Sequence, residues 1–393
     1  MGIMVKLVNK SFKIRIYPNK EQEEKLIQNI GCARFVYNSC LEANEVDYGL
    51  KVQDNLEDLK VGNKTYFNNH LNTLKKVKSW LREVESTCLQ ASYERLIDSL
   101  KRFFKGQNKY PRYKSKHNPV QSIKIKANKS SNDKLTIRFE DNMLKLPKIG
   151  LIKYKDNRKI TGRILSATIS HKANRWYASI NCTDVPVESK TQTSVNIGSD
   201  LGLTNFCILS NGEKITKLDV AREENQYRRL QRALSRKTLG SANFNKNKLQ
   251  LAHKYQKIVD KRNDYLQKIS TRLVNEFDII CIESLNVKGM SSKGKAFKKG
   301  LNRSIFNASW SKFIDMLKYK SEWYDKSLSQ IDRFFPSSKT CSSCGYKHDD
   351  FGLHIRKWVC PVCKTTHDRD VNAAINILNE GLKLISTVGT TGI

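Results

Sequence analysis

Phe277-Asp-Ile-Ile-Cys-Ile-Glu283 is an apolar run of strand length that ends in a carboxylate. Its apolar and β-branched residues predict a buried central strand, and Glu283 then stands where that strand leaves the core. Asn196-Ile-Gly-Ser-Asp-Leu-Gly-Leu-Thr-Asn205 repeats the arrangement, because a strand over 194–199 is expected to end at Asp200. A single acid at the end of a strand is as often a turn former as a catalytic group, so neither acid decides the function alone.

A third acid lies in His367-Asp-Arg-Asp-Val-Asn-Ala-Ala374, where the final helix is expected to begin. Asp368 has the position of an N-cap, and Asp370 falls in the first turn. A core does not tolerate unpaired carboxylates, so three such acids favour shared metal binding. Three carboxylates can hold two Mg²⁺ ions roughly 3.5–4 Å apart, the arrangement that hydrolyses phosphodiesters. We predict a catalytic magnesium site at Asp200, Glu283 and Asp370, as in an RNase H-like nuclease core.

Four cysteines towards the C-terminus are paired by their spacing. Cys341-Ser-Ser-Cys344 and Cys360-Pro-Val-Cys363 form the pattern C-x2-C-x15-C-x2-C, which is typical of a zinc site. Four thiolates complete a tetrahedral shell, so this zinc ion is expected to be structural, and the finger is expected to be disordered without it. Two disulfides or four free thiols are the competing interpretation, which the basic, intracellular character of the chain disfavours. The nearby His348, His354 and His367 are expected to be surface or neighbouring groups rather than ligands.

The charge of the chain indicates a polyanionic partner. Lys and Arg total 71 against 38 acidic residues, a formal net charge of +33. This excess predicts tight, salt-sensitive binding to phosphates, although a basic binder without any chemistry would share it. The segment Lys109-Tyr-Pro-Arg-Tyr-Lys-Ser-Lys116 interleaves cations with aromatic rings, and the loop over 288–303 is rich in Gly, Ser and Lys. Nucleic-acid contacts are predicted at Lys109, Arg112, Lys114, Lys116, Lys288 and Lys293, with ordinary solvated loops as the alternative.

Nothing in the sequence predicts a membrane protein. No apolar run approaches the ~18 residues of a spanning helix, and Met1–Lys6 lacks the apolar stretch of a signal peptide. Six further cysteines stand among apolar neighbours and are expected to be small buried thiols in a reducing compartment. We therefore expect an intracellular, soluble protein.

Hydrophobic periodicity divides the chain into blocks. Helical spacing predicts helices over 20–48, 68–81 and 86–104, and short alternating segments predict strands over 11–17 and between 121 and 182. The strands suggest a small β-barrel into which the helices are inserted. After the polar stretch Val185–Thr193, expected to be a linker, further elements are predicted. They are strands at 206–210, 214–217 and 331–335, and helices at 219–275 (broken near 239–243), 307–327 and 368–384.

Several motifs together resemble the TnpB proteins encoded by insertion sequences, whose split RuvC nuclease core is shared with type V CRISPR effectors. The resemblance covers nearly the whole chain. Its most specific motifs are Asp332-Arg-Phe-Phe-Pro-Ser-Ser-Lys-Thr-Cys341 and His367-Asp-Arg-Asp-Val-Asn-Ala-Ala374. Ser199 departs from the family, which usually has an apolar residue before the catalytic Asp, and no effect on catalysis is expected.

The resemblance implies an α+β multidomain fold. It consists of a wedge-type β-barrel (1–18 and 106–185), a helical recognition domain inserted into it (19–105), a linker (186–193) and an RNase H-like, RuvC-type nuclease domain (194–335 and 365–393). A four-Cys zinc finger (336–364) is inserted in the nuclease domain. Asp200, Glu283 and Asp370 match the catalytic positions of the family, and Cys341, Cys344, Cys360 and Cys363 match its zinc positions.

The implied activity is that of an RNA-guided DNA endonuclease encoded by a transposable element. Such an enzyme takes a guide RNA transcribed from the element end and cuts double-stranded target DNA beside a short flanking motif, with two Mg²⁺ ions. A monomer with bound RNA, in the prokaryotic cytoplasm and at the nucleoid, is expected. The alternatives are a nuclease-inactive RNA-guided repressor, a transposase or transposase accessory protein, and a plain zinc-ribbon nucleic-acid binder.

Overall fold

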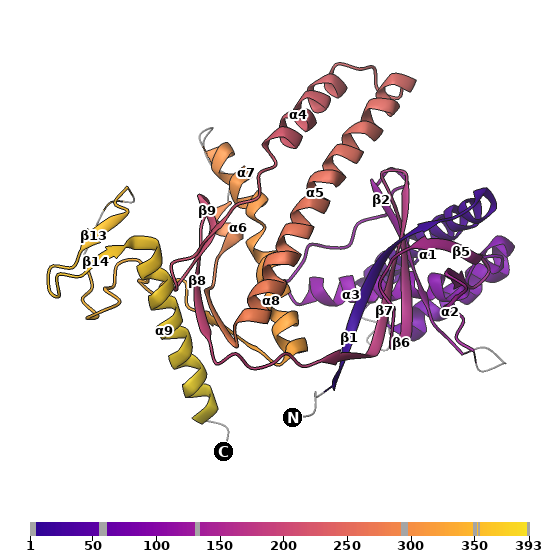
Figure 1. The fold of residues 1–393 in the computed structure, drawn as a ribbon. Coiled ribbons are helices and arrows are strands. Elements are labelled where there is room, and N and C mark those ends of the chain that lie inside the picture. The colour runs from indigo at the N-terminus through magenta and orange to yellow at the C-terminus, as the bar shows by residue number, and fades with distance from the viewer. Residues whose placement is uncertain are drawn as a thin grey trace. The chain divides into compact units, whose positions relative to one another are not determined.

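Among the described residues, the α+β chain forms two large sheets, of seven and five strands, and a small two-stranded one (Figure 1). The computed structural model describes residues 5–54, 61–129, 134–291, 298–348, 352 and 354–390. They form two units, one of Leu7–Pro186 and one that contains the chain from Val187 onward together with Val5 and Lys6. None of the described helices is long and apolar enough to cross a membrane.

The first unit contains a curled sheet of seven strands in the order β2-β6-β7-β1-β5-β4-β3. An isolated antiparallel bridge between Lys129 and Leu135 joins the chain that leaves β2 to the chain that enters β3, so the two edges are linked. The curling agrees with the predicted barrel. The strands are β1 (Val5–Tyr17), β2 (Val120–Lys126), β3 (Arg138–Glu140), β4 (Met143–Leu146), β5 (Gly150–Lys155), β6 (Arg163–Lys172) and β7 (Arg175–Glu188).

Three helices are inserted between β1 and β2: α1 (Lys20–Gln53), α2 (Lys64–Val77) and α3 (Ser86–Phe104), with a short 3₁₀ helix at Ser79–Arg82. A capping box begins α1, because Asn19 Oδ1 accepts from Gln22 N at 2.8 Å and Gln22 Oε1 accepts from Asn19 N at 3.0 Å. Gln22 also donates to Leu151 O at 2.7 Å, which fixes the start of α1 on β5.

The second unit is built on a five-stranded sheet in the order β10-β9-β8-β11-β12. β8, β9 and β10 form an antiparallel meander, whereas β8, β11 and β12 run parallel. The strands are β8 (Asn196–Leu201), β9 (Asn205–Leu209), β10 (Lys214–Thr216), β11 (Ile279–Glu283) and β12 (Ser327–Ile331). Two of the predicted acids, Asp200 and Glu283, lie on strands of this mixed sheet.

Helices cover both faces of the second sheet (Figure 1). On one face, Ile197 and Ile282 pack with Leu273 and Phe313 in one hydrophobic core. That face is covered by α5 (Ala242–Glu276) and α8 (Trp310–Tyr324), and α9 (Arg369–Thr390) covers the other. The helix α4 (Ala221–Ser235) pairs with the outer part of α5 and forms a long hairpin that projects from the sheet. The short α6 (Val287–Met290) and α7 (Lys298–Ala308) follow β11.

Two of the predicted elements are corrected by the structure. The single helix expected over 307–327 is divided, because Ser309 has a left-handed backbone (φ 53°) between α7 and α8. The strand expected over 331–335 is wrong, since β12 ends at Ile331 and the side chain of Asp332 accepts from Phe334 N at 2.7 Å in a turn. Two short strands in the cysteine segment, β13 (Lys357–Val359) and β14 (Thr366–Asp368), were not predicted.

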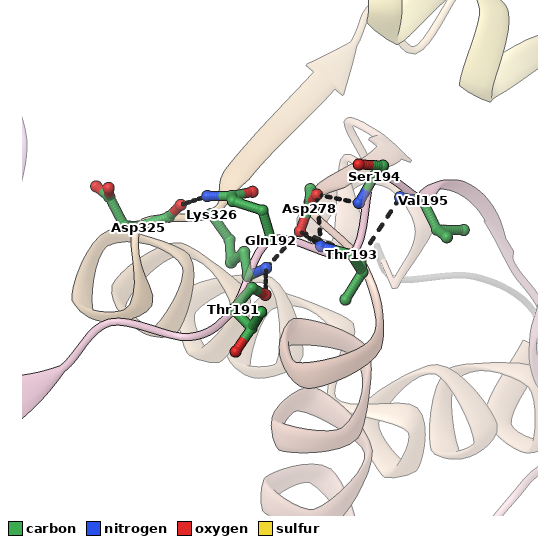
Figure 2. Close-up of polar contacts among 8 residues, drawn as sticks. All are labelled: Thr191, Gln192, Thr193, Ser194, Val195, Asp278, Asp325 and Lys326. Atoms are coloured by element: carbon green, nitrogen blue, oxygen red, sulfur yellow. Dashed lines mark hydrogen bonds and ion pairs between the residues drawn. The ribbon is translucent and has the colours of Figure 1, made fainter. Parts of the chain in front are cut away.

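The polar stretch before β8 is firmly attached to the second sheet (Figure 2). The carboxylate of Asp278 accepts from Thr193 N at 2.9 Å, from Ser194 N at 2.6 Å and from the ammonium of Lys326. The Lys326 side chain is 0% exposed and also donates to Thr191 O at 2.7 Å. Burial opposes ionisation, but these hydrogen bonds outweigh it and lower the pKa of Asp278 to about 2. These contacts therefore hold residues 191–194 in place beside Asp278 and Lys326.

Candidate active site and metal centre

Asp200 and Glu283 lie on neighbouring parallel strands. The register pairs Ser199 of β8 with Ile282 of β11, so the two acids stand at equivalent places near the strand ends. Side chains alternate along a strand, and Ile282 belongs to the core under α5 and α8. The side chains of Asp200 and Glu283 consequently belong to the opposite face, which α9 covers.

The helix α9 approaches this face closely at two glycines. A Cβ at Gly198 of β8 would lie 2.8 Å from Leu378 Cβ, and one at Gly381 of α9 would lie 2.7 Å from Cys281 Cβ. Neither distance is one that real side chains tolerate, so only glycine permits the contact. Ser329 of β12 adds a hydrogen bond to Gly381 O at 3.0 Å. This contact fixes α9 across three strands and thereby sets the position of its first turn.

Asp370 is in that first turn. Asp368 accepts from Asp370 N at 3.1 Å and from Val371 N at 3.3 Å, which confirms the predicted N-cap. Asp368 also pairs with Lys214 of β10 at 3.0 Å, a contact that ties the helix start to the edge of the sheet. The side chain of the half-buried Asp370 contacts Arg356, whose Nη1 lies 3.4 Å from Asp370 Oδ1.

The three acids share one electrostatic neighbourhood. Burial, followed by the charges of Asp370 and Glu283, raises the pKa of Asp200 to about 7, although Arg369 acts in the opposite direction. Burial and the nearby Asp332 also raise the pKa of Glu283. Crowded, partly desolvated carboxylates of this kind resist ionisation until a cation neutralises them, which fits a site for divalent metal ions.

The acids are less tightly gathered than the cysteines. Within the described ranges, the four cysteines are the one set of three or more possible ligands whose donor atoms all lie within 4.8 Å of one another. The contact between Asp370 and Arg356 draws the third carboxylate towards the cysteine segment. Arg356 was not predicted, and no local signal could have identified it, because its partner is brought close only by the fold.

The four cysteines form the expected cluster. Cys341 Sγ is 3.6 Å from Cys363 Sγ, and Cys344 Sγ is 3.6 Å from Cys360 Sγ. Hydrogen bonds from the hydroxyl and backbone of Thr365 lower the pKa of Cys363, which favours the thiolate that binds a metal. Four sulfurs at these distances suit a tetrahedral metal ion. The six remaining cysteines are buried, as predicted.

Neighbouring side chains support this cluster. His367 is buried, its Nε2 is 3.1 Å from Cys341 Sγ, and its ring lies 4.7 Å from that of Trp358. Asn376 of α9 donates to Ser337 O at 2.8 Å and to Thr340 O at 2.6 Å. The buried Asn372 donates to Thr340 O at 2.7 Å and accepts from Ser342 N at 2.9 Å. The cysteine segment is thus fastened to the helix that carries Asp370.

The predicted nucleic-acid contacts fall into distinct environments. Lys109, Arg112 and Lys116 are exposed. Lys114 instead places its ammonium 3.4 Å from the centre of the Tyr37 ring, and burial, helped by Arg95, lowers its pKa to about 7. The side chain of Lys288 and the whole of Lys293 lie outside the described residues. Nucleic-acid contacts by all six residues stay predictions, and Lys114 in addition contacts the Tyr37 ring within the protein.

Three family models match the chain. One described as "Probable transposase" matches residues 179–293, and one described as "Cas12f1-like, TNB domain" matches residues 310–377. A third, described as "Helix-turn-helix domain", matches residues 4–50. In the structure, the described part of that third range is a strand, β1, followed by a single long helix, α1.

Similar proteins cover most of the chain. A protein of Streptomyces pristinaespiralis named "Putative RNA-guided DNA endonuclease" is 36% identical over 96% of this chain and 91% of its own length. One of Escherichia coli, "Putative RNA-guided DNA endonuclease InsQ", is 29% identical over 94% and 92%. A solved Cas12f1-sgRNA-target DNA complex has a TM-score of 0.59 at 13% identity and covers 95% of this chain and 99% of its own, a likeness of fold alone. With its length and its motifs matched in this way, the chain belongs to the TnpB family.

Proposed function

We propose that the protein is an RNA-guided DNA endonuclease of a transposable element, the activity for which its relatives are named. The observation that carries the proposal is the shared electrostatic neighbourhood of Asp200, Glu283 and Asp370, on two parallel strands and a helix. Many structural acids stand at the ends of strands, but here the charges of Asp370 and Glu283 add to burial in raising the pKa of Asp200, which is unusual for purely structural acids.

The three carboxylates would hold Mg²⁺. Bound there, the ions would activate a water molecule and stabilise the leaving oxygen of a phosphodiester. Asp200 and Glu283 would supply oxygen ligands from fixed strand ends, and Asp370 from the first turn of α9. Arg356, which contacts Asp370, would turn to the phosphate once that carboxylate is engaged, because a guanidinium binds phosphate oxygens well.

The four cysteines would hold a structural zinc ion, since the donor set is closed and leaves no position for substrate. The ion would order the chain between Ser337 and Cys363, and with it the backbone that Asn372 and Asn376 hold. The zinc site would therefore keep the start of α9 in place for catalysis. We assign this finger to 336–364 and the nuclease domain to 194–335 and 365–393.

The partners would be a guide RNA and a double-stranded DNA target. The net charge of +33 favours a polyanionic partner, and base pairing by the guide would supply the sequence specificity. The helical block (19–105) and the curled sheet (1–18 and 106–185) would form the recognition and wedge domains, where Lys109, Arg112, Lys114 and Lys116 lie. Lys288 and Lys293 would also contact nucleic acid.

The test uses protein purified with its RNA, whose sequence defines a plasmid target with a randomised flanking motif. Asp200→Asn, Glu283→Gln and Asp370→Asn should each abolish cutting in Mg²⁺ and leave RNA binding unchanged. Asp264→Asn is the matched control, because Asp264 is an exposed acid on α5 that pairs with Lys268 four residues on. Guided DNA binding by the wild type without any cutting would indicate a repressor, and strand transfer without RNA would indicate a transposase. Either result would refute the proposal.

A further inference from the structure

The turn after β12 presents an aromatic ring to solvent. Phe334 is 77% exposed, whereas the next residue, Phe335, packs against the core formed by Cys281, Ile331 and Ile377. A phenylalanine gains nothing from water, and a polar residue at its position would serve the turn equally well. Single exposed apolar side chains are common on protein surfaces, so the exposure of Phe334 becomes informative only through its surroundings.

The turn that carries Phe334 is rigid. Asp332 Oδ1 accepts from Phe334 N at 2.7 Å, and Asp332 O accepts from Phe335 N at 3.2 Å. Ser337 N then donates to Phe335 O at 2.8 Å, and Pro336 lies between them. These contacts, with the anchored Phe335 ring, fix the backbone on both sides of Phe334. Its ring is therefore held ready for a partner without a large loss of entropy on binding.

The same turn borders the acids. Ile331, the last residue of β12, pairs with Glu283 in the parallel register, and Ser284 N donates to Ile331 O at 3.0 Å. Phe334 is three residues further along, so its Cα lies within about 16 Å of the Cα of Glu283, from the reach of an extended chain and the spacing of strands. A strand of nucleic acid held at the acids can therefore reach Phe334 through one of its neighbouring nucleotides.

A cation accompanies the ring. The guanidinium of Arg333 lies 4.5 Å from the centre of the Phe334 ring. An exposed aromatic ring with an adjacent guanidinium is the combination that binds single-stranded nucleic acid, because the ring stacks on a base and the cation contacts a phosphate. A base pair inside a duplex offers such a ring a free face only after costly unstacking, so an unpaired base is the favoured occupant.

We propose that Phe334 and Arg333 bind the DNA strand that is being cut, with the Phe334 ring stacked on an unpaired base close to the scissile phosphate. Arg333 contacts the phosphate next to that base. The inference rests on the proposed function for the identity of the strand. It adds the requirement that the DNA be single-stranded at the site, which duplex opening by a guide RNA would satisfy.

The first experiment measures cutting. RNA-loaded wild type, Phe334→Ala and Phe334→Trp are compared under single-turnover conditions, with Leu239→Ala as the matched control, because Leu239 is 83% exposed on the α4–α5 connection. Loss of one stacked base corresponds to 1–3 kcal/mol, so Phe334→Ala should cut about 5- to 150-fold more slowly. Phe334→Trp should restore cutting and Leu239→Ala should leave it unchanged. Equal rates for all four proteins would overturn the proposal.

The second experiment measures stacking directly and does not need cutting. Single-stranded DNA with the fluorescent base 2-aminopurine at successive positions is added to protein in the Asp200→Asn background. Quenching at a position should disappear with Phe334→Ala and persist with Phe334→Trp. Quenching that is insensitive to Phe334, or that occurs with RNA alone, would overturn the inference even if the wild type cuts. If the wild type does not cut, the proposed function fails, and the fluorescence still decides whether Phe334 stacks on DNA.

Discussion

Replacing Gly198 by alanine tests whether the close contact of α9 sets the active site. The added Cβ would lie 2.8 Å from Leu378 Cβ and closer still to Ala374 O. Real Cβ contacts essentially never fall below 3.0 Å, and the contact with Ala374 O would be 2.0 Å, so α9 must recede by about 1 Å or more. Overpacking of this kind costs about 1–3 kcal/mol of unfolding free energy. Because Asp370 moves with α9, and a displacement of about 1 Å can slow catalysis about 10²-fold, cutting should fall by about that factor.

The assays are urea unfolding and single-turnover cutting of a plasmid target by the RNA-loaded protein. Gly31→Ala is the matched control, since Gly31 lies inside α1 and a Cβ there would meet nothing within 4 Å. That variant should be stabilised by about 0.5–1 kcal/mol, as expected for alanine in a helix interior, and should cut normally. If Gly198→Ala unfolds at the wild-type urea concentration and cuts at the wild-type rate, the idea that this contact positions Asp370 is refuted.

Three further predictions concern buried polar groups. Asn376→Ala removes two hydrogen bonds to the cysteine segment and should lower the free energy of unfolding by about 1–3 kcal/mol. It should also speed the release of zinc to a chelator, and an unchanged rate of release would contradict the proposed coupling. Asp278→Ala leaves the Lys326 ammonium without its carboxylate and should lower the free energy of unfolding, measured with urea, by about 3–5 kcal/mol. The double variant with Lys326→Met should recover most of that free energy. Lys320 is 5% exposed and hydrogen-bonded to Ser270 Oγ at 2.7 Å, and burial lowers its pKa from 10.5 to about 8. Between these two pH values the unfolded chain binds more protons than the folded chain, so folding becomes more favourable as the pH rises. The free energy of unfolding of the wild type should therefore increase by up to about 3 kcal/mol relative to that of Lys320→Met between pH 8 and pH 10.5. A pH-independent difference between the two proteins would show that Lys320 titrates normally.

Local signals predicted much of the fold. Apolar runs and turn residues identified β8, β9 and β11 to within two residues, and helical spacing identified α3 and the division between α4 and α5. The placement of the acids followed from these elements, because Asp200 and Glu283 end apolar strands and Asp370 follows an N-cap. Signals of this kind depend on neighbours in the sequence, which is why they could be interpreted without a structure.

The errors and omissions concern contacts between distant residues. Ser327-Leu-Ser-Gln-Ile331 is too polar to suggest a strand, yet it forms the edge strand β12, because it pairs with β11 and Ser329 bonds to Gly381 of a helix much later in the chain. Three other features also depend on contacts between distant residues. They are the close approach of α9 at Gly198, the pairing of Arg356 with Asp370, and the hydrogen bonds from Asn376 to the cysteine segment. In each case the chemical partner is absent from the local sequence, so no pattern of spacing could reveal it.

The crowding of Asp200 with Glu283 and Asp370 has a consequence for how this protein can be improved. Mutual repulsion and burial weaken the metal-free fold at this edge of the sheet, as the raised pKa of Asp200 shows. Selection for heat resistance alone would therefore favour amides in place of these acids, and the expected product is a thermostable protein that no longer cuts DNA. Thermostable variants should be sought at solvent-facing positions far from the sheet edge, and screened for cutting at every round.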